Sequence, residues 1–375
     1  MIYFDSAATT LQKPDSVRRA VAEAVNTMSS PGRGSYQATR RAEETAYQCR
    51  AEAADLFGVE NPENVVFTSN ATHGLNIAIA SVIRPGMRVL ISGYEHNAVT
   101  RPLHAIPGVQ LTVLDTPPFQ PEKMLEQCKK ALESGVDAVV CTHVSNVFGA
   151  VQPVGEMAAL CRQRHIPFIL DASQSAGILP VRMDTLEASF IAMPGHKGLY
   201  GPQGTGLLLC NAETAPLLYG GTGSLSLQQE MPTALPDRLE AGTHNMPGIA
   251  GLLEGIRFVK RKGIDSIAAH ERQLTMQACE ALRAMEGVRV FYREGFAHQT
   301  GVLSFIVEGW GCEETAEAMA QRGIALRSGL QCAPLAHRTV GTLSTGTVRF
   351  SPSVFNTSQQ VEQFIQELRA LLREK

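Results

Sequence analysis

The residues Pro-Phe-Ile-Leu-Asp-Ala-Ser-Gln, at positions 167–174, join a short apolar run to polar side chains that follow it directly. Six other short runs are similarly rich in Val, Ile, Leu or Phe: Val65–Thr68, Arg88–Ser92, Gln110–Leu114, Asp137–Thr142, Ser189–Met193 and Thr205–Leu209. Such runs are typical of strands that are buried on both faces. Amphipathic stretches lie between several of them, including Glu122–Glu133 and Gly155–His165. The alternation of strands and helices predicts an α/β fold with a mostly parallel sheet flanked by helices.

The rest of the chain is organised around this sheet. Arg41–Phe57 is predicted to be a helix that ends at Gly58, and residues 219–248 are predicted to form a long loop. Beyond about Gly255 longer helices replace the strands, and the last of them is expected at Ser358–Glu374. We therefore place a boundary near residue 250. The prediction is a large α/β domain at 15–250 and a smaller α+β domain made of 1–14 and 251–375.

Composition excludes several classes of protein. The 375 residues are 44% hydrophobic and 18% charged, with a formal charge of −3, which indicates a globular chain without a basic nucleic-acid surface. No apolar run approaches the roughly 20 residues that span a bilayer, and no signal peptide is visible. The eight cysteines include no CxxC pair, so we expect reduced thiols, no metal site and a cytoplasmic location.

Polar side chains follow five of the predicted strands, where parallel α/β sheets bind their ligands. These residues are Ala71-Thr72-His73 at the start of a helix, Glu95-His96, His143 to Asn146, Asp171 to Gln174, and His196-Lys197. Any one of them has a structural interpretation, because Asp171 is a suitable helix N-cap and an isolated lysine is usually a solvated charge. Their convergence at one sheet edge favours a binding site.

Asp171 and Lys197 together suggest the chemistry of that site. A carboxylate after a fully apolar strand needs a cationic partner, and Lys197 lies between glycines that we expect to allow close approach of a ligand. An aspartate that pairs with a pyridinium nitrogen and a lysine that forms a Schiff base are the protein groups that bind pyridoxal phosphate. The helix that opens at Ala71 is predicted to hold the phosphate of this cofactor.

At this point the chain resembles the cysteine desulfurase and selenocysteine lyase branch of the class V aminotransferase-like, fold-type-I enzymes that depend on pyridoxal 5'-phosphate. The resemblance covers almost the whole chain. It is carried by Tyr3 to Thr10, Glu95-His96, His143 to Asn146, Asp171 to Gln174, Gly195-His196-Lys197, Glu240 to Thr243, Arg327 to Ala333, and Arg349.

The resemblance implies a role for each residue that matches a family motif. Lys197 forms the Schiff base and then acts as the base, Asp171 stabilises the protonated ring, and His96 stacks on it. Gln174 and Asn146 face the ring oxygen and the substrate, while Ala71, Thr72 and His196 bind the phosphate. Arg349, assisted by Arg327, binds the substrate carboxylate. Thr243 reaches the phosphate in a neighbouring subunit, which implies a homodimer.

Cys332 is implied to be the nucleophile, in a loop of the smaller domain. The expected reaction converts L-cysteine to L-alanine and leaves the sulfur on Cys332 as a persulfide for an acceptor protein. Arg327 and His337 are candidates for the positive charge that activates the thiol. The other seven cysteines are interpreted as core residues.

The sequence departs from the family pattern at several positions, including Tyr36, which stands where histidine is often found. Leu330 and Gln331 stand where histidines are common, and Pro194 stands where a hydroxyl residue often binds phosphate. These departures leave two alternatives open. One is a selenocysteine lyase that uses the same residues with selenocysteine as substrate. The other is a class V aminotransferase or β-lyase in which Cys332 is not essential.

Overall fold

A seven-stranded sheet forms the centre of the computed structural model, which describes residues 1–32 and 34–374. Its strands, in spatial order, are β2 (Val65–Thr68), β8 (Gly206–Cys210), β7 (Phe190–Pro194), β6 (Phe168–Asp171), β5 (Ala138–Thr142), β3 (Arg88–Ser92) and β4 (Gln110–Leu114). Only β8 runs against its neighbours, so the predicted mostly parallel sheet is confirmed.

Helices cover both faces of this sheet because alternate residues of each strand point to opposite sides. Leu90, Val139 and Leu170 face one core, which is completed by α2 (Gln37–Phe57), α5 (Pro121–Glu133), α6 (Val154–Arg162), α7 (Met183–Leu186) and α8 (Met246–Lys262). Their sequence neighbours Val89 and Val140 face another core with α3 (Ala71–Val82) and α4 (Asn97–Ala105). This double burial explains why the strands read as continuous apolar runs.

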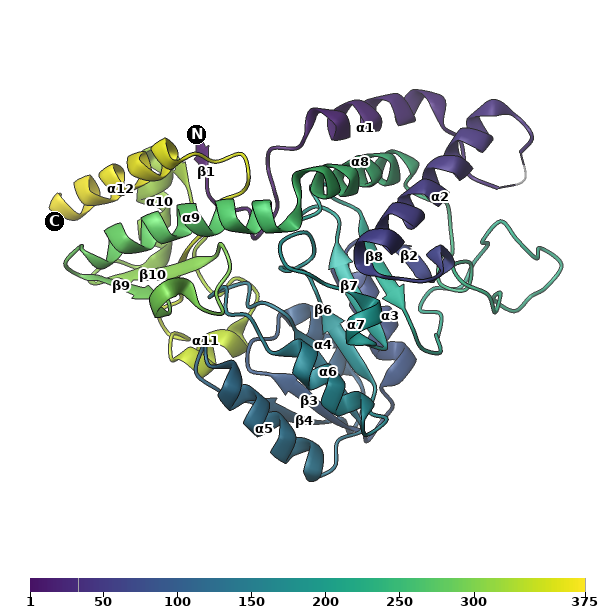
Figure 1. Ribbon diagram of the computed structural model, residues 1–375, viewed down its shortest axis with the longest axis horizontal. Coiled ribbons are helices and arrows are strands. Elements are labelled where there is room, and N and C mark those ends of the chain that lie inside the picture. Colours follow the sequence, from purple (N-terminus) through teal and green to yellow (C-terminus); the bar gives the residue numbers. More distant parts are fainter. Residues whose placement is uncertain (33, 375) are drawn as a thin grey trace.

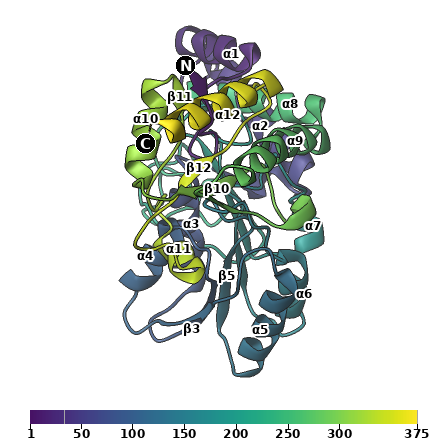
Figure 2. The ribbon, with the colours of Figure 1, turned by 90° about the vertical axis from the view of Figure 1, so that its left-hand side faces the viewer.

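A second group of elements lies beside the sheet, with α9, α10 and α12 gathered around β9 and β10 (Figure 1). Its three-stranded sheet contains β12 (Val348–Phe350), β10 (Leu303–Val307) and β9 (Val288–Phe291). Its helices are α9 (Ile264–Arg283), α10 (Cys312–Gln321), α11 (Pro334–Val340) and α12 (Ser358–Arg373). The N-terminal strand β1 (Ile2–Tyr3) also belongs here, because it pairs with β11 (Ile324–Ala325). Figure 2 shows the N-terminus and β11 near α12.

Several predicted bounds differ slightly from the structure. β6 and β7 begin and end one residue later than predicted, so Asp171 is the last residue of its strand. The long loop runs from 211 to 245 and reaches out beyond α2 (Figure 1). α1 (Asp15–Thr27) packs on α8, and two 3₁₀ turns occur at Pro62–Asn64 and Glu294–Phe296. The predicted boundary near 250 falls within α8, and the division into two domains stays a prediction.

Within residues 1–32 and 34–374, no helix has the length and apolar character that crossing a membrane requires.

Candidate active site

A cavity of about 210 Å³ lies at the carboxyl ends of β3, β5, β6 and β7. Eight residues that the sequence singled out line it: Ala71, Thr72, His96, Asn146, Asp171, Gln174, His196 and Lys197. They come from the last residue of β6, from the loops that follow the strands and from the first turn of α3, and they meet because parallel strands end at the same sheet edge. The fold therefore brings most of the predicted site together in one place.

Two charged side chains line this cavity: Asp171, the last residue of β6, and Lys197, in the loop that follows β7. The Asp171 side chain is buried, and its Oδ1 accepts a hydrogen bond of 2.9 Å from the Ser173 amide, although no helix begins there. Burial lowers the pKa of Lys197 to about 8, and the negative charge of Asp171 partly opposes this shift. Near neutral pH a fraction of the lysine is therefore an uncharged amine, which is the form that acts as a nucleophile or base.

The glycines around Lys197 serve a different purpose from the one predicted. A Cβ atom on Gly195 would lie 2.2 Å from Thr205 Oγ1, and one on Gly198 would lie 2.3 Å from the Ala176 carbonyl oxygen. The loop is packed too tightly against its protein neighbours to carry side chains at these positions. The expectation that these glycines make room for a ligand is therefore corrected: they make room for the protein.

The start of α3 forms one end of the cavity. The helix begins at Ala71, where the Asn70 side chain caps it by accepting a 2.9 Å hydrogen bond from the His73 amide. Such a helix start favours a phosphate because its amides point outward. Burial lowers the pKa of His196 to about 4, so its imidazole is neutral and contributes hydrogen bonding rather than charge. Its Nδ1 lies 3.0 Å from Thr9 Oγ1.

His96 has a fixed tautomer when it is neutral. It is the N-cap of α4, and its Nδ1 accepts a 3.0 Å hydrogen bond from the Ala98 amide. The remaining proton therefore resides on Nε2. Burial lowers the pKa of His96, with the Asp171 charge opposing the shift, so the neutral form predominates near pH 7. His96 can offer a flat ring and one N–H donor.

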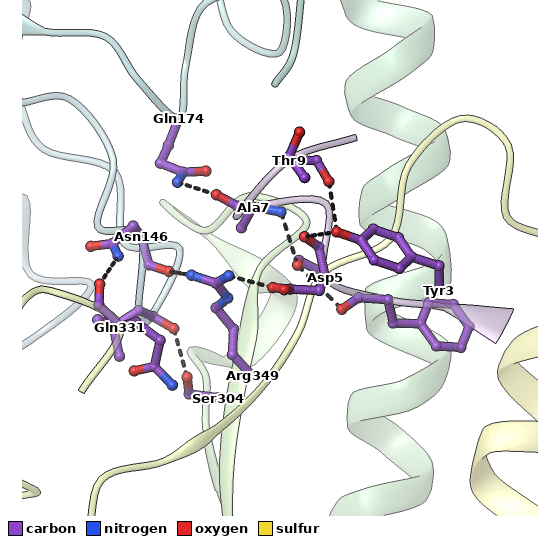
Figure 3. Close-up of polar contacts among 12 residues, drawn as sticks. Tyr3, Asp5, Ala7, Thr9, Asn146, Gln174, Ser304, Gln331 and Arg349 are labelled. Carbon is purple, nitrogen blue, oxygen red and sulfur yellow. Dashed lines mark hydrogen bonds and ion pairs between the residues drawn. The ribbon is translucent and has the colours of Figure 1, made fainter. Parts of the chain in front are cut away.

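Arg349 lies at the centre of a buried network that joins the N-terminal segment to the cavity (Figure 3). Its Nη2 is 2.6 Å from Asp5 Oδ1, and its Nη1 donates a 2.9 Å hydrogen bond to the Asn146 carbonyl oxygen. Its Nε is buried and has no partner within the described chain. Arg327 runs alongside it through backbone hydrogen bonds between the two residues. The predicted carboxylate-binding arginine is therefore already paired with an aspartate.

Cys332 is exposed at the tip of a rigid loop. Gln331 and Cys332 have φ values of 42° and 56°, a region that residues other than glycine seldom adopt. The loop is held because Asn146 Nδ2 donates to the Gln331 carbonyl oxygen at 2.8 Å, and Gln331 Nε2 donates to the Thr347 carbonyl oxygen at 2.9 Å. Strain of this kind persists only where the surroundings enforce it.

His337 does not supply the charge that was predicted for activating Cys332. Its ring is buried, with Nε2 2.9 Å from Gln331 Oε1 and Nδ1 2.8 Å from Thr342 Oγ1. Burial lowers its pKa to about 4, so it is neutral and acts as a support for Gln331. Cys332 raises the pKa of Lys197, so this lysine is one cationic group that acts on the thiol, and the predicted contribution of Arg327 stays a prediction.

Thr243 lies apart from the other predicted residues. It lines a second cavity, of about 270 Å³, together with Ser69, which precedes α3, and His73 in the first turn of α3. The two cavities thus adjoin the same helix end. The role of Thr243 in a neighbouring subunit's site stays a prediction.

Two residues near the site were not assigned roles from the sequence. Glu95 is fully buried, and its Oε1 accepts hydrogen bonds from the amides of Ser92 (3.3 Å) and Thr142 (2.8 Å), which ties β3 to β5 beside His96. Burial raises the pKa of Glu95 to about 8. Asp5 is the partner of Arg349, 344 residues away, and no local pattern could reveal that pairing.

The chain matches known proteins along almost its whole length. The class-V aminotransferase family model matches residues 2–364. A probable cysteine desulfurase of Xylella fastidiosa is 32% identical over 98% of this chain and 90% of the relative, and one of Pyrococcus abyssi is 31% identical over 100% and 94%. A probable cysteine desulfurase of Mycolicibacterium paratuberculosis is 31% identical over 99% of this chain, which spans 55% of that longer relative.

Two solved structures of cysteine desulfurases resemble the chain along almost its whole length. The apo structure of a cysteine desulfurase from Thermococcus onnurineus superposes with a TM-score of 0.91 at 30% identity, over 100% of this chain and 95% of the other. An Escherichia coli cysteine desulfurase in an S-sulfonic acid form gives a TM-score of 0.88 at 25% identity, over 99% and 94%.

Proposed function

Because the chain belongs to the class-V aminotransferase family and to its cysteine desulfurases, we propose that it converts L-cysteine to L-alanine with pyridoxal 5'-phosphate and collects the sulfur on Cys332. The observation that carries this proposal is the placement of a buried aspartate and a lysine of lowered pKa in one cavity, next to an exposed cysteine. Any one of these groups could be purely structural, but a desulfurase needs all three within reach of one another.

The residues of the cavity fit the cofactor. A buried carboxylate, an amine and a helix start that favours anions match its ring nitrogen, its aldehyde and its phosphate. We assign these contacts to Asp171, to Lys197, and to Ala71 and Thr72 with His196. Gln174 is assigned to the ring oxygen, although its Nε2 also donates a 2.9 Å hydrogen bond to the Ala7 carbonyl oxygen. When bound, the cofactor supplies an electron-withdrawing ring that stabilises the negative charge left at the substrate Cα.

Lys197 and His96 are the groups that handle protons. With a pKa near 8, the Lys197 amine accepts a proton from the substrate Cα at its Nζ and later returns one to carbon. His96 lines the cavity where we place the cofactor ring, and its Nε2–H group is available as a hydrogen-bond donor. Both side chains are partly buried, which limits the access of water to the substrate Cα while its proton is removed.

Cys332 receives the sulfur. Its thiolate attacks the sulfur of the substrate, so that an S–S bond forms while the bond from that sulfur to carbon breaks. The carbon takes the electron pair and a proton, and it leaves as alanine. The αL turn at Gln331 and Cys332 holds the thiol outward, in a position that both the substrate and a later sulfur acceptor can reach.

Arg349 and Arg327 are assigned to the substrate carboxylate, since a guanidinium binds a carboxylate through two parallel hydrogen bonds. We further propose a homodimer in which Thr243 completes the partner's phosphate site, because the cavity that Thr243 lines adjoins the start of α3. A protein acceptor takes the sulfur from the exposed Cys332. A cytoplasmic location is supported by eight cysteines that are all free thiols.

The test is alanine release from L-cysteine with a reductant present, measured on the cofactor-loaded protein and its C332A variant. We expect alanine from the wild type and none from C332A. The matched control is C279A, which removes a buried thiol of α9 and should keep its activity. Alanine from C332A at the wild-type rate would make the thiol dispensable and contradict the proposal. Selenocysteine, tested with the same variants, distinguishes the lyase reaction.

A further inference from the structure

Cys332 lies in a tight turn whose backbone conformation its sequence does not favour. The Ala333 amide donates a 2.8 Å hydrogen bond to the Leu330 carbonyl oxygen, which closes a four-residue turn. The two central residues, Gln331 and Cys332, both have positive φ values, of 42° and 56°. Positive φ at both central positions is the mark of a type I′ turn, in which Gly, Asn and Asp are strongly preferred. Contacts with other parts of the protein must therefore hold this turn.

Two of these contacts are made by the amide group of the buried Gln331 side chain. Its Nε2 donates a 2.9 Å hydrogen bond to the Thr347 carbonyl oxygen, and its Oε1 lies 2.9 Å from His337 Nε2. Because a carbonyl oxygen only accepts, the amide must direct Nε2 to Thr347 and Oε1 to His337. Burial lowers the pKa of His337 to about 4, so the ring is neutral, with its proton on Nε2, and Nδ1 accepts from the Thr342 hydroxyl at 2.8 Å. Donor and acceptor are thus assigned at every step of this chain of hydrogen bonds.

The backbone of the turn is bound to the cofactor cavity on its other side. Asn146, which lines the cavity, donates from Nδ2 to the Gln331 carbonyl oxygen at 2.8 Å. The Asn97 amide donates to the Cys332 carbonyl oxygen, also at 2.8 Å. Asn97 is the first residue of α4 and directly follows His96, which lines the same cavity. The nucleophile is therefore fixed, through its own backbone, to the residues that surround the predicted cofactor ring.

We propose that Gln331 is a positioning residue for sulfur transfer: its amide group holds the turn in the conformation that presents the Cys332 thiol to the substrate sulfur. The site needs one side chain that donates to Thr347 and accepts from His337 at the same time, and an amide of this length does both. This role gives a reason for glutamine at a position where the sequence departs from the family pattern. The inference rests on the proposed function, because it presumes that Cys332 attacks the substrate sulfur.

The proposal separates two steps of the reaction. Removal of the Cα proton by Lys197 does not require the thiol, because L-alanine carries the same proton and contains no sulfur. Attack by Cys332 on sulfur, in contrast, requires that the two sulfur atoms meet in line, and a misplacement of about 1 Å can slow such a step about 100-fold. Loss of the Gln331 amide should therefore slow the sulfur step and leave the proton step unchanged.

The experiment measures both steps in the cofactor-loaded wild type and in Q331M, which keeps the length of the side chain and removes its amide. Alanine release from saturating L-cysteine, with a reductant, should fall about 10- to 100-fold in Q331M. Exchange of the L-alanine Cα hydrogen for deuterium, followed by ¹H NMR in D₂O, should keep the wild-type rate. The matched control is Q299M, because Gln299 is 5% exposed and its Nε2 also donates to backbone carbonyl oxygens, those of Phe148, Phe291 and Val302. Q299M should keep both rates.

Unchanged alanine release in Q331M overturns the proposal, even if the variant is less stable. An equal fall of both rates overturns it too, because the whole cofactor site would then be damaged, and so does an equal loss of release in Q299M. If Q331M does not fold, H337F takes its place: it keeps a ring, removes the donor to Gln331 Oε1 and should separate the two rates in the same way. A wild type that releases no alanine overturns the proposed function and this inference together, whereas an active wild type with an equally active Q331M overturns this inference alone.

Discussion

Replacing Asp5 by Asn removes the counter-ion of Arg349 while keeping the size of the side chain. The pair is buried, with exposed side-chain fractions of 13% and 3%, and its Nη2–Oδ1 distance is 2.6 Å. Removing one partner of such a pair leaves an uncompensated charge and costs about 3–5 kcal/mol. The Asn146 carbonyl oxygen, which accepts from Nη1, cannot replace the lost negative charge. We therefore expect D5N to reduce the free energy of unfolding by about 3 kcal/mol or more.

Urea denaturation of wild type and D5N, followed by circular dichroism, measures this loss as a shift of the midpoint. The control is D15N, which breaks the Asp15–Arg18 pair at the surface, where the side chains are 71% and 69% exposed. An exposed pair contributes little to stability, because water and salt screen its charges. A loss in D5N no larger than that in D15N would refute the reasoning, because Arg349 would then be satisfied without Asp5.

The same variant connects stability to substrate binding. If the substrate carboxylate binds Arg349, it supplies the negative charge that D5N lacks. Saturating L-alanine should therefore raise the melting temperature of cofactor-loaded D5N more than that of the wild type. An equal rise in both proteins would contradict the assignment of Arg349 to the carboxylate.

Three further predictions concern buried ionisable groups. Alanine release should rise with pH up to about 8, as Lys197 loses its proton; a rate that is flat through this range would contradict its role as the base. Burial raises the pKa of Glu271 from 4.5 to about 8, so between these pH values the native state binds a proton that the unfolded state does not, and the free energy of unfolding falls as pH rises. Urea midpoints measured across this pH range should depend less on pH in E271Q than in the wild type, and an equal dependence in both proteins would contradict this effect of burial. E240Q should lower the free energy of unfolding by about 3–5 kcal/mol, because the buried Arg50 guanidinium loses the carboxylate that its Nη1 and Nη2 contact at 2.8 and 2.6 Å. A loss below about 1 kcal/mol in urea or thermal unfolding would mean that the pair is not buried as described.

The sequence predicted the sheet and the centre of the site because both depend on local patterns. The three strands Val65–Thr68, Arg88–Ser92 and Gln110–Leu114 have the predicted bounds, since an apolar run with a turn on each side has few other structures available. Asp171 and Lys197 could be found because the ends of parallel strands are the expected place for ligands. The last helix, predicted at Ser358–Glu374, is found as α12, and reciprocal hydrogen bonds of Thr357 and Gln360 cap its start.

The features that the sequence did not predict depend on contacts between distant segments. The Asp5–Arg349 pair cannot be recognised from local sequence, because it forms only when the second group of elements packs against the sheet. Gly198 was misinterpreted for the same reason: the Ala176 carbonyl that fills its space comes from another turn of the chain. Likewise, the sequence suggests that His337 is available, but the fold encloses it.

The N-terminal segment has a consequence for synthesis of the protein on the ribosome. Residues 2 and 3 pair with residues 324 and 325, and Asp5 pairs with Arg349, which lies 344 positions later in the chain. At about 5–20 residues per second, the first residues to emerge remain without their partners for tens of seconds. The sheet can fold during that interval, whereas the arginine network is completed only at the end of translation. A nascent chain that is released early would therefore carry a folded sheet beside an unfinished site.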